Sequence, residues 1–189
     1  MNYEIKMDEL LEKNLTETAF GFWNALKDKI PSVWNRSTSS TGKYHKKEDG
    51  SVPNIAEHTY EMLYACINLW RMFDIKAKTS EGDTLLLAVA LHDSYKYGKT
   101  PEERQHTVSD HDKIIADKIK NASKYIETFL SESQVQVLEE ATRFHNGRWS
   151  KDANMNDFDF SIYHPYTNFV HMLDMMSANN LIKMPLEKE

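Results

Sequence analysis

The sequence predicts an all-α protein that folds as a single helical bundle. Along most of its 189 residues, apolar side chains recur every three or four positions, which is the spacing of one helix face. Only six glycines and five prolines are present, whereas a β-sandwich or barrel needs a turn about every 8 to 12 residues. No strand-like alternation persists in the sequence, and its length suits one domain with a sizeable core.

Helical periodicity begins near the N-terminus. A first helix is predicted over residues 7–30, and Pro31 ends it because the residue before a proline disfavours helical backbone angles. Residues 35–51 follow as a polar loop rich in Ser and Thr, and a loop of that length in a compact domain is often functional. Asn54 is suited to cap the next helix, with Glu57 three positions later.

The most apolar stretch is residues 84–93, with the sequence TLLLAVALHD. A helix that is apolar on all sides is expected in the middle of a bundle. This predicted helix ends with His92 and Asp93. Polar residues 94–110 precede a further helix, whose apolar pattern starts just after His111.

Two more helices are predicted towards the C-terminus. Ser131 and Gln134 have the spacing of a capping box, which predicts a helix that reaches His145. Residues 146–165 are rich in Asn, Asp and Gly and are interpreted as a loop. The last helix is predicted over residues 166–182.

These elements divide the chain into three parts. Residues 1–53 hold the N-terminal helix and the polar loop, residues 54–182 form the helical core, and residues 183–189 are a short tail. No internal repeat is present in the sequence.

Composition excludes several classes of protein. No apolar run approaches the roughly 18 residues of a membrane helix, and the first residues lack the features of a secretory signal. The single cysteine, Cys66, cannot form an internal disulfide, which favours the cytoplasm. The net charge of −6 argues against a dedicated nucleic-acid-binding protein.

The positions of the histidines are the most informative feature. Four of them fall in or at the end of predicted helices, and two aspartates join them, one directly after a histidine and one inside an apolar helix. The set is His58, His92, Asp93, His111, His145 and Asp174. Burying so many ionisable groups is costly unless a cation compensates. Imidazoles and carboxylates together suit Mn, Fe, Co, Ni or Zn.

The adjacent pair His92–Asp93 constrains the geometry. Neighbouring residues on a helix point about 100° apart. Both side chains therefore reach one metal ion only where a helix ends or bends, or else they bridge two ions. Gly98 shortly afterwards suits such a helix end. A carboxylate between two cations leaves room for a hydroxide, which suits phosphoester cleavage.

These residues resemble the HD-domain metal-dependent phosphohydrolases over residues 54–182. The resemblance rests on the order His58, His92–Asp93 and Asp174, within the segments IAEHTYEML, LLAVALHDSYKYG and HMLDMMSAN. It implies a helical bundle of the HD-domain type. It also implies that these four residues hold a first divalent transition-metal ion.

Family members with two ions have further histidines between the doublet and the last aspartate. His111 and His145 lie where these would be expected, with Mg²⁺ as a further candidate for the second ion. His106 is a rival to His111, which we favour because a helical apolar pattern starts right after it. Asn146 stands where some dinuclear members have a second consecutive histidine.

Four residues are candidates for binding substrate. Lys96 follows the doublet at a spacing where the family often has a lysine near the substrate phosphate, although a solvated loop lysine is an equal alternative. Lys43 and His45 lie in a Ser/Thr-rich loop that is able to bind phosphate or sugar, or is simply a polar linker. Arg148 could clamp a phosphate or anchor its own loop.

The resemblance implies an enzyme that hydrolyses a nucleotide or another small phosphoester with metal-activated water. Asp93 and Lys96 are its expected catalytic residues. Two alternatives stay open: a di-iron oxygenase of the same domain type, and a non-catalytic nucleotide-binding module. The expected partner is a small phosphorylated substrate, with neither membrane nor nucleic acid. The N-terminal helix lies outside the resemblance and could pack against a second copy of the chain.

Overall fold

The computed structural model is all-helical, which confirms the predicted class. It describes residues 2–31, 33–39, 41, 45–123, 129–154 and 158–184. The α-helices of these residues are α1 (Tyr3–Asn14), α2 (Glu17–Lys27), α3 (Ile55–Leu69), α4 (Ser80–Leu91), α5 (His111–Ser123), α6 (Glu132–Phe144) and α7 (Pro165–Ala178). Short 3₁₀ helices lie between these α-helices, at Trp70–Phe73, Pro101–Glu103, Gly147–Trp149 and Phe160–Ile162. Within the described ranges no strand forms, and Ser37 and Asn54 make an isolated bridge.

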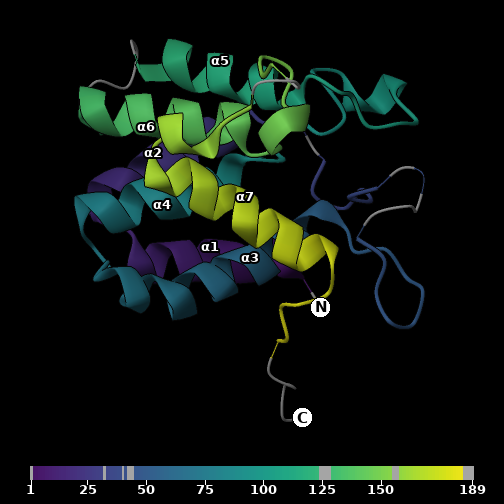
Figure 1. The fold of residues 1–189 in the computed structure, drawn as a ribbon, viewed down its shortest axis with the longest axis horizontal. Helices are drawn as coiled ribbons and strands as arrows, with labels where there is room; N and C mark the ends of the chain where they lie inside the picture. Colours follow the sequence, from purple (N-terminus) through teal and green to yellow (C-terminus); the bar gives the residue numbers. More distant parts are fainter. Residues whose placement is uncertain are drawn as a thin grey trace.

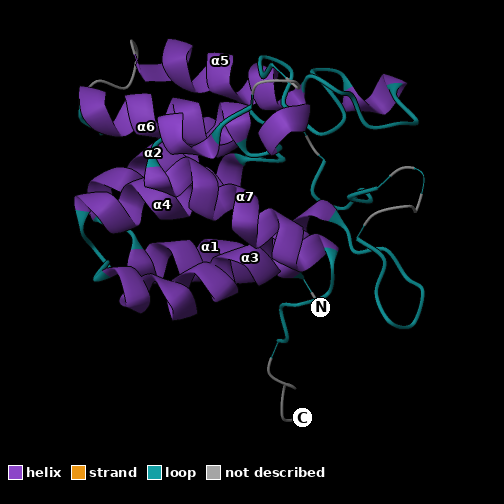
Figure 2. Cartoon of the chain, viewed as in Figure 1, coloured by secondary structure: helices purple, strands orange, loops and turns teal. Residues whose placement is uncertain are grey.

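The helices lie in layers. In Figure 1, α5 and α6 form the upper layer, α2, α4 and α7 the middle, and α1 and α3 the lower. The connecting segments gather at one end of the bundle, as the loop colouring of Figure 2 shows. None of the described helices combines the length and apolarity needed to cross a membrane.

Helix α4 is the centre of the bundle. It packs against α1, α2, α3, α6 and α7. Every residue from Gly82 to Leu91 is buried, in agreement with the prediction that this helix is apolar on all sides. The helix begins earlier than the predicted residue 84, because the Thr79 side chain accepts a hydrogen bond from the Gly82 N–H and caps it. Its C-terminal end brings His92 into the interior.

The prediction of one helix over residues 7–30 is wrong. The chain leaves helical geometry at Leu15 and Thr16, so that α1 and α2 are separate. The Thr16 hydroxyl oxygen caps α2, and the same residue donates its N–H and its O–H to the Asp83 carboxylate at 2.9 and 2.6 Å. The break is therefore held by a tertiary contact with α4. Both N-terminal helices share one apolar core with the rest of the bundle.

The two helix starts with predicted caps are confirmed. The Asn54 side chain accepts a hydrogen bond of 2.8 Å from the Glu57 N–H at the start of α3. Ser131 and Gln134 form a complete capping box at the start of α6. Helix α7 ends at Ala178 rather than at the predicted residue 182.

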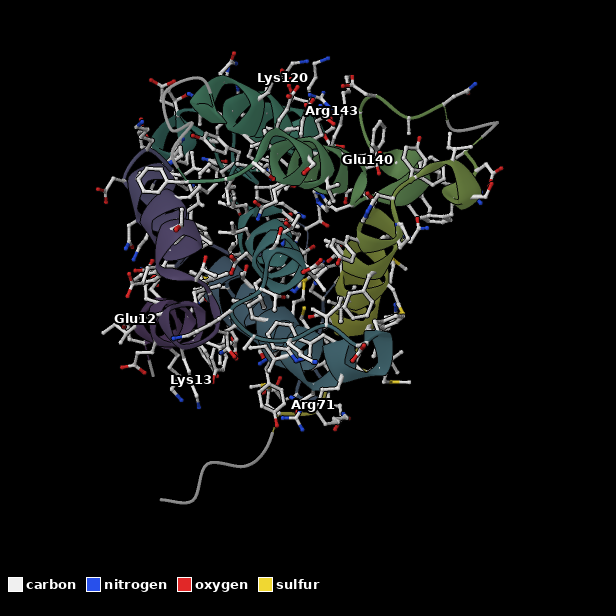
Figure 3. The ribbon with its side chains drawn as sticks, turned by 90° about the vertical axis from the view of Figure 1, so that its left-hand side faces the viewer. Glu12, Lys13, Arg71, Lys120, Glu140 and Arg143 are labelled. Carbon is white, nitrogen blue, oxygen red and sulfur yellow. The ribbon has the colours of Figure 1, made fainter. Side chains whose placement is uncertain are left out.

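Helix α7 is fixed to α6 near its first turn. Glu140 of α6 accepts hydrogen bonds from the His164 N–H at 2.6 Å and from the Thr167 hydroxyl at 2.7 Å. Figure 3 shows Glu140 on the side of α6 that faces α7, while Glu12, Lys13 and Arg71 lie at the opposite end of that view. This anchor sets the position of the helix that carries Asp174.

The long polar loop is attached to the segment that follows α4. The Arg36 guanidinium lies 3.8 Å from the centre of the Tyr97 ring and donates to the Pro101 carbonyl. The Tyr97 hydroxyl in turn donates to the Ser37 carbonyl at 2.9 Å. These contacts hold the start of the loop beside the residues that follow the His92–Asp93 pair.

Candidate metal centre

The His92–Asp93 pair lies just beyond the end of α4. The helix ends at Leu91, and the chain continues in a series of tight turns up to Gly98, whose φ of +77° suits glycine. Within these turns the Lys96 N–H bonds to the Asp93 carbonyl at 2.9 Å. Because the helix ends here, the two side chains are free of the 100° separation that a continuing helix imposes.

The structure brings together the six residues that the sequence suggests as ligands. They come from five different helices or helix ends: His58 from α3, His92 and Asp93 after α4, His111 from the start of α5, His145 after α6, and Asp174 from α7. All six are buried. Their donor atoms form two groups that share Asp93: His58, His92 and Asp93, which Asp174 joins through His58, and Asp93, His111 and His145.

The first group contains four residues. The His58 Nε2 lies 3.2 Å from the His92 Nε2 and 3.2 Å from the Asp174 Oδ1. The Asp93 Oδ2 lies 3.9 Å from the His58 Nε2 and 3.7 Å from the His92 Nε2. Donor atoms from three parts of the chain, α3, the end of α4 and α7, therefore meet at His58.

The second group uses the other oxygen of Asp93. Its Oδ1 lies 3.1 Å from the His111 Nε2 and 3.5 Å from the His145 Nε2. The two histidine nitrogens are 3.3 Å apart. The Asp93 carboxylate thus faces one histidine pair with each oxygen, which is the arrangement of a bridging ligand.

Hydrogen bonds on the far side of each ring determine which nitrogen is free. The Nδ1 atoms of His92, His111 and His145 donate to the carbonyls of Val89, Val108 and Thr142, at 2.7, 3.0 and 2.7 Å. A carbonyl only accepts, so each Nδ1 carries the hydrogen and each neutral ring presents a bare Nε2 lone pair.

His58 follows the same pattern through a side chain. Its Nδ1 lies 2.9 Å from the Ser177 hydroxyl, which donates to Glu61 at 3.4 Å. In both groups, bare nitrogens therefore face each other at hydrogen-bond distance with no hydrogen to share. A cation between them resolves this conflict.

The spacing and the unpaired atoms fit a metal ion. Two donors that are each about 2.1 Å from one transition-metal ion lie about 3.0 to 4.2 Å apart, depending on the angle between them at the ion. The Asp93 Oδ2 and the Asp174 Oδ1 are buried and have no hydrogen-bond partner among the described residues. Such atoms are rare in proteins because an unpaired buried oxygen is costly. The cluster can hold metal ions, and its imidazole and carboxylate donors suit transition metals.

Burial keeps two of the histidine donors in the neutral form that metal ligands require. Burial lowers the pKa of His92 to about 3, and burial also lowers that of His111. Burial opposes protonation of His145 as well, but the hydrogen bond and charge of Asp93 raise its pKa. The pKa of Asp93 is well below its usual range: burial opposes ionisation, but the Lys96 charge, the neighbouring His92 and the hydrogen bonds from His111 and His145 together outweigh it.

Lys96 lies inside the centre. Its Nζ is 2.9 Å from the Asp93 Oδ1, and its side chain is largely buried. Burial works against the charge of this amine, but Asp93, with smaller contributions from Asp174 and Asp112, outweighs burial and raises the pKa of Lys96. The residue is therefore a fixed cation beside the bridging carboxylate.

The other residues that the sequence suggests for the site lie in different environments. His45 is buried, with its ring centre 4.6 Å from that of His58. Arg148 is exposed and lies 5.8 Å from the Trp149 ring centre. His106 is also exposed, while its rival His111 is in the cluster. Lys43 lies outside the described residues.

Several supporting residues were not identified from the sequence. Ser177 and Glu61 orient His58, although each stands three positions from a ligand on its helix, which is a usable signal. Asn146 places its Nδ2 3.3 Å from the His111 Nε2. His171 donates from its Nδ1 to the His145 carbonyl at 2.6 Å.

No family model, curated protein or solved structure matches this chain. The geometry of the centre itself therefore carries the functional argument.

Proposed function

We propose that this protein is a metal-dependent phosphohydrolase of the HD-domain type, acting on a nucleotide or another small phosphoester. The observation that carries the proposal is the position of Asp93 between two pairs of bare histidine nitrogens. His58, His92, Asp93 and Asp174 would hold one ion, and Asp93, His111 and His145 a second. A shared carboxylate keeps two such ions at a short, constant separation, which suits in-line attack on phosphorus.

Ions held by these residues would supply Lewis acidity for the phosphoryl oxygens and would lower the pKa of an attacking water. The chain supplies the orientation. Backbone carbonyls fix the tautomers of His92, His111 and His145, so these rings need no reorganisation to present their Nε2 atoms. Burial of all six ligands places them in a medium of low dielectric, which strengthens the electrostatic interactions of the ligand shell.

Lys96 would stabilise the charge that develops on the transferred phosphoryl group. It is a buried cation whose position is set by a 2.9 Å ion pair with Asp93. A cation that is positioned before the reaction costs no reorganisation when charge develops on the substrate. The oxygen that it contacts, Oδ1, is the one that faces His111 and His145.

Two alternatives use the same residues. A di-iron oxygenase of the same domain type would need the same six ligands, and dependence on oxygen distinguishes it from a hydrolase. A non-catalytic nucleotide-binding module would not need Asp93 between two histidine pairs. The intact donor set therefore favours an enzyme.

The test begins with metal analysis of untagged protein purified without chelator. The wild type is then assayed with Mn²⁺, Fe²⁺, Co²⁺ or Ni²⁺ on p-nitrophenyl phosphate, bis-p-nitrophenyl phosphate and a panel of nucleotides, in air and without oxygen. We expect phosphate release that requires metal, is independent of oxygen and is lost in His92→Ala/Asp93→Ala. The matched control is His106→Ala, which changes an exposed histidine outside the cluster.

Activity only in air, with iron, would replace the hydrolase by the oxygenase. Metal binding and nucleotide binding without turnover would indicate the binding module. Full hydrolase activity in the Asp93 variant would exclude this centre as the active site.

A further inference from the structure

A seventh residue with a free donor atom lies against the first ligand group. His45 comes from the polar loop outside the helices, yet only 8% of it is exposed. Its Nδ1 is buried and has no hydrogen-bond partner within the described part of the chain. One donor atom each of His45, His58 and Asp174 lie within 4.8 Å of one another.

The unpaired buried atoms are concentrated at this point. Three donor atoms of the cluster have no hydrogen-bond partner among the residues that the structure describes, namely the His45 Nδ1, the Asp93 Oδ2 and the Asp174 Oδ1. The two oxygens already belong to the first group, and His45 stands edge-on to His58 at an angle of 76°. An atom left without a partner in the interior is costly, and a cation bound beside His58, which lies near all three, would satisfy them.

The backbone at His45 supports a specific role for its side chain. Its φ is +58°, in the left-handed region that a residue with a side chain adopts at a cost. Strain of this kind persists where surrounding structure holds it, and it is concentrated at functional positions. The contacts of Arg36 and Tyr97 hold the start of the loop at this end of the bundle.

We propose that His45 is a fifth protein ligand of the first metal ion, so that the positions left open for substrate are on the second ion. This inference rests on the proposed metal centre and gives its two metal sites different roles. The first ion is enclosed by His45, His58, His92, Asp93 and Asp174.

The second ion has three protein ligands, Asp93, His111 and His145. Structural sites fill their coordination with protein atoms, whereas catalytic sites keep positions open.

Two further residues indicate that the substrate binds beside the second ion. Lys96 contacts the Asp93 Oδ1, which faces the second group, and the Asn146 amide reaches the His111 Nε2 at 3.3 Å. A cation and an amide beside open positions suit a phosphoryl group. His45, in contrast, has a buried Nδ1 that a substrate cannot approach from solvent.

The test is titration of the metal-free full-length protein with Co²⁺, followed by calorimetry and by the visible absorption of the bound ion. His45→Asn is the principal variant, because asparagine tolerates left-handed backbone angles. We expect the wild type to bind two ions. The variant should keep one with unchanged affinity, bind the other at least about 10-fold more weakly, and change the Co²⁺ spectrum. His106→Asn is the matched control and should match the wild type.

Double variants assign the loss to one ion. Asp174→Asn should remove the first ion, and adding His45→Asn to it should change nothing further. His145→Asn should weaken the second ion only, and adding His45→Asn should then weaken the remaining one. The effects of His45→Asn and Asp174→Asn would then be non-additive, whereas those of His45→Asn and His145→Asn would add. This result is expected only if His45 and Asp174 bind the same ion.

Other results would overturn the proposal. If His45→Asn binds two Co²⁺ ions with wild-type affinity and spectrum, His45 is not a ligand, and an increase in KM alone would make it a substrate contact. If the wild type itself binds no Co²⁺, the metal centre and therefore the proposed function fail as well. Far-UV circular dichroism checks folding, and His45→Gly serves as a second variant compatible with the backbone.

Discussion

The Lys96 ammonium lies 2.9 Å from the Asp93 Oδ1, and both side chains are largely withdrawn from solvent. Without metal, this lysine is the nearest fixed cation to a carboxylate that also faces four histidines. Removing one partner of a buried ion pair leaves an uncompensated charge.

Replacing Lys96 with Met should therefore destabilise the metal-free protein. We expect the free energy of unfolding to fall by about 3 to 5 kcal/mol, because Asp93 loses its counter-charge in the interior. Mn²⁺ should restore most of this loss, since the ions replace the missing charge. Urea denaturation with chelator and with Mn²⁺ measures both values. Lys99→Met, at an exposed position, should change neither.

Asp93→Asn should abolish binding of both ions, because one carboxylate serves both groups. Asp174→Asn is the matched variant: it removes the same charge from the first group only and should leave the second ion bound. Elemental analysis after dialysis against Mn²⁺ compares the two. Equal metal contents in the two variants would show that Asp93 does not bridge.

The stability of the metal-free protein should fall as pH decreases from about 6.5. Burial lowers the pKa of His92 to about 3 and that of His45 to about 4, while an unfolded histidine titrates near 6.5. Between these values the unfolded chain binds more protons, so each such histidine contributes a slope of up to about 1.4 kcal/mol per pH unit. The raised pKa of His145 opposes this trend.

Urea denaturation at several pH values between 7.5 and 4.5, roughly the range over which these histidines titrate in the unfolded chain, measures the slope. His92→Asn should flatten it because one low-pKa histidine is removed. A free energy of unfolding that increases as the pH falls from 7 to 5 would contradict the burial of neutral histidines.

Gly147→Ala should weaken the second ion. Gly147 has a φ of +60°, and a Cβ there would lie 2.8 Å from the His171 Cε1, whose ring holds the His145 carbonyl. The methyl group must displace His171 and thereby shift His145. Gly50→Ala is the matched control, since it has the same backbone cost at a φ of +85° but meets only the end of Lys46 at 3.8 Å. Titration with Co²⁺ should show a weaker second site in the first variant alone.

The sequence predicts local features of this protein well. The caps at Asn54 and Ser131 and the buried character of α4 follow from a few neighbouring residues, and the structure has all three. The end of α4 next to His92 was also expected, because Gly98 follows within one turn or two. These features depend on contacts of short range.

The features that the sequence does not predict depend on distant partners. The break at Thr16 is held by Asp83, which is 67 residues away along the chain. His171 lies one helical turn before Asp174, yet it bonds to a carbonyl of another element. The burial of His45 likewise requires a loop to be held against the bundle. Helical periodicity contains no information about such contacts.

Because Asp93 belongs to both ligand groups, the two groups become complete at different times during synthesis of the chain. All donors of the second group are present once residue 145 has left the ribosome, whereas the first group waits for Asp174. Domains generally begin to fold from the N-terminal side during synthesis. A nascent chain that ends between residues 145 and 174 contains all three ligands of the second group but lacks Asp174 of the first. The second site can therefore bind its metal ion first.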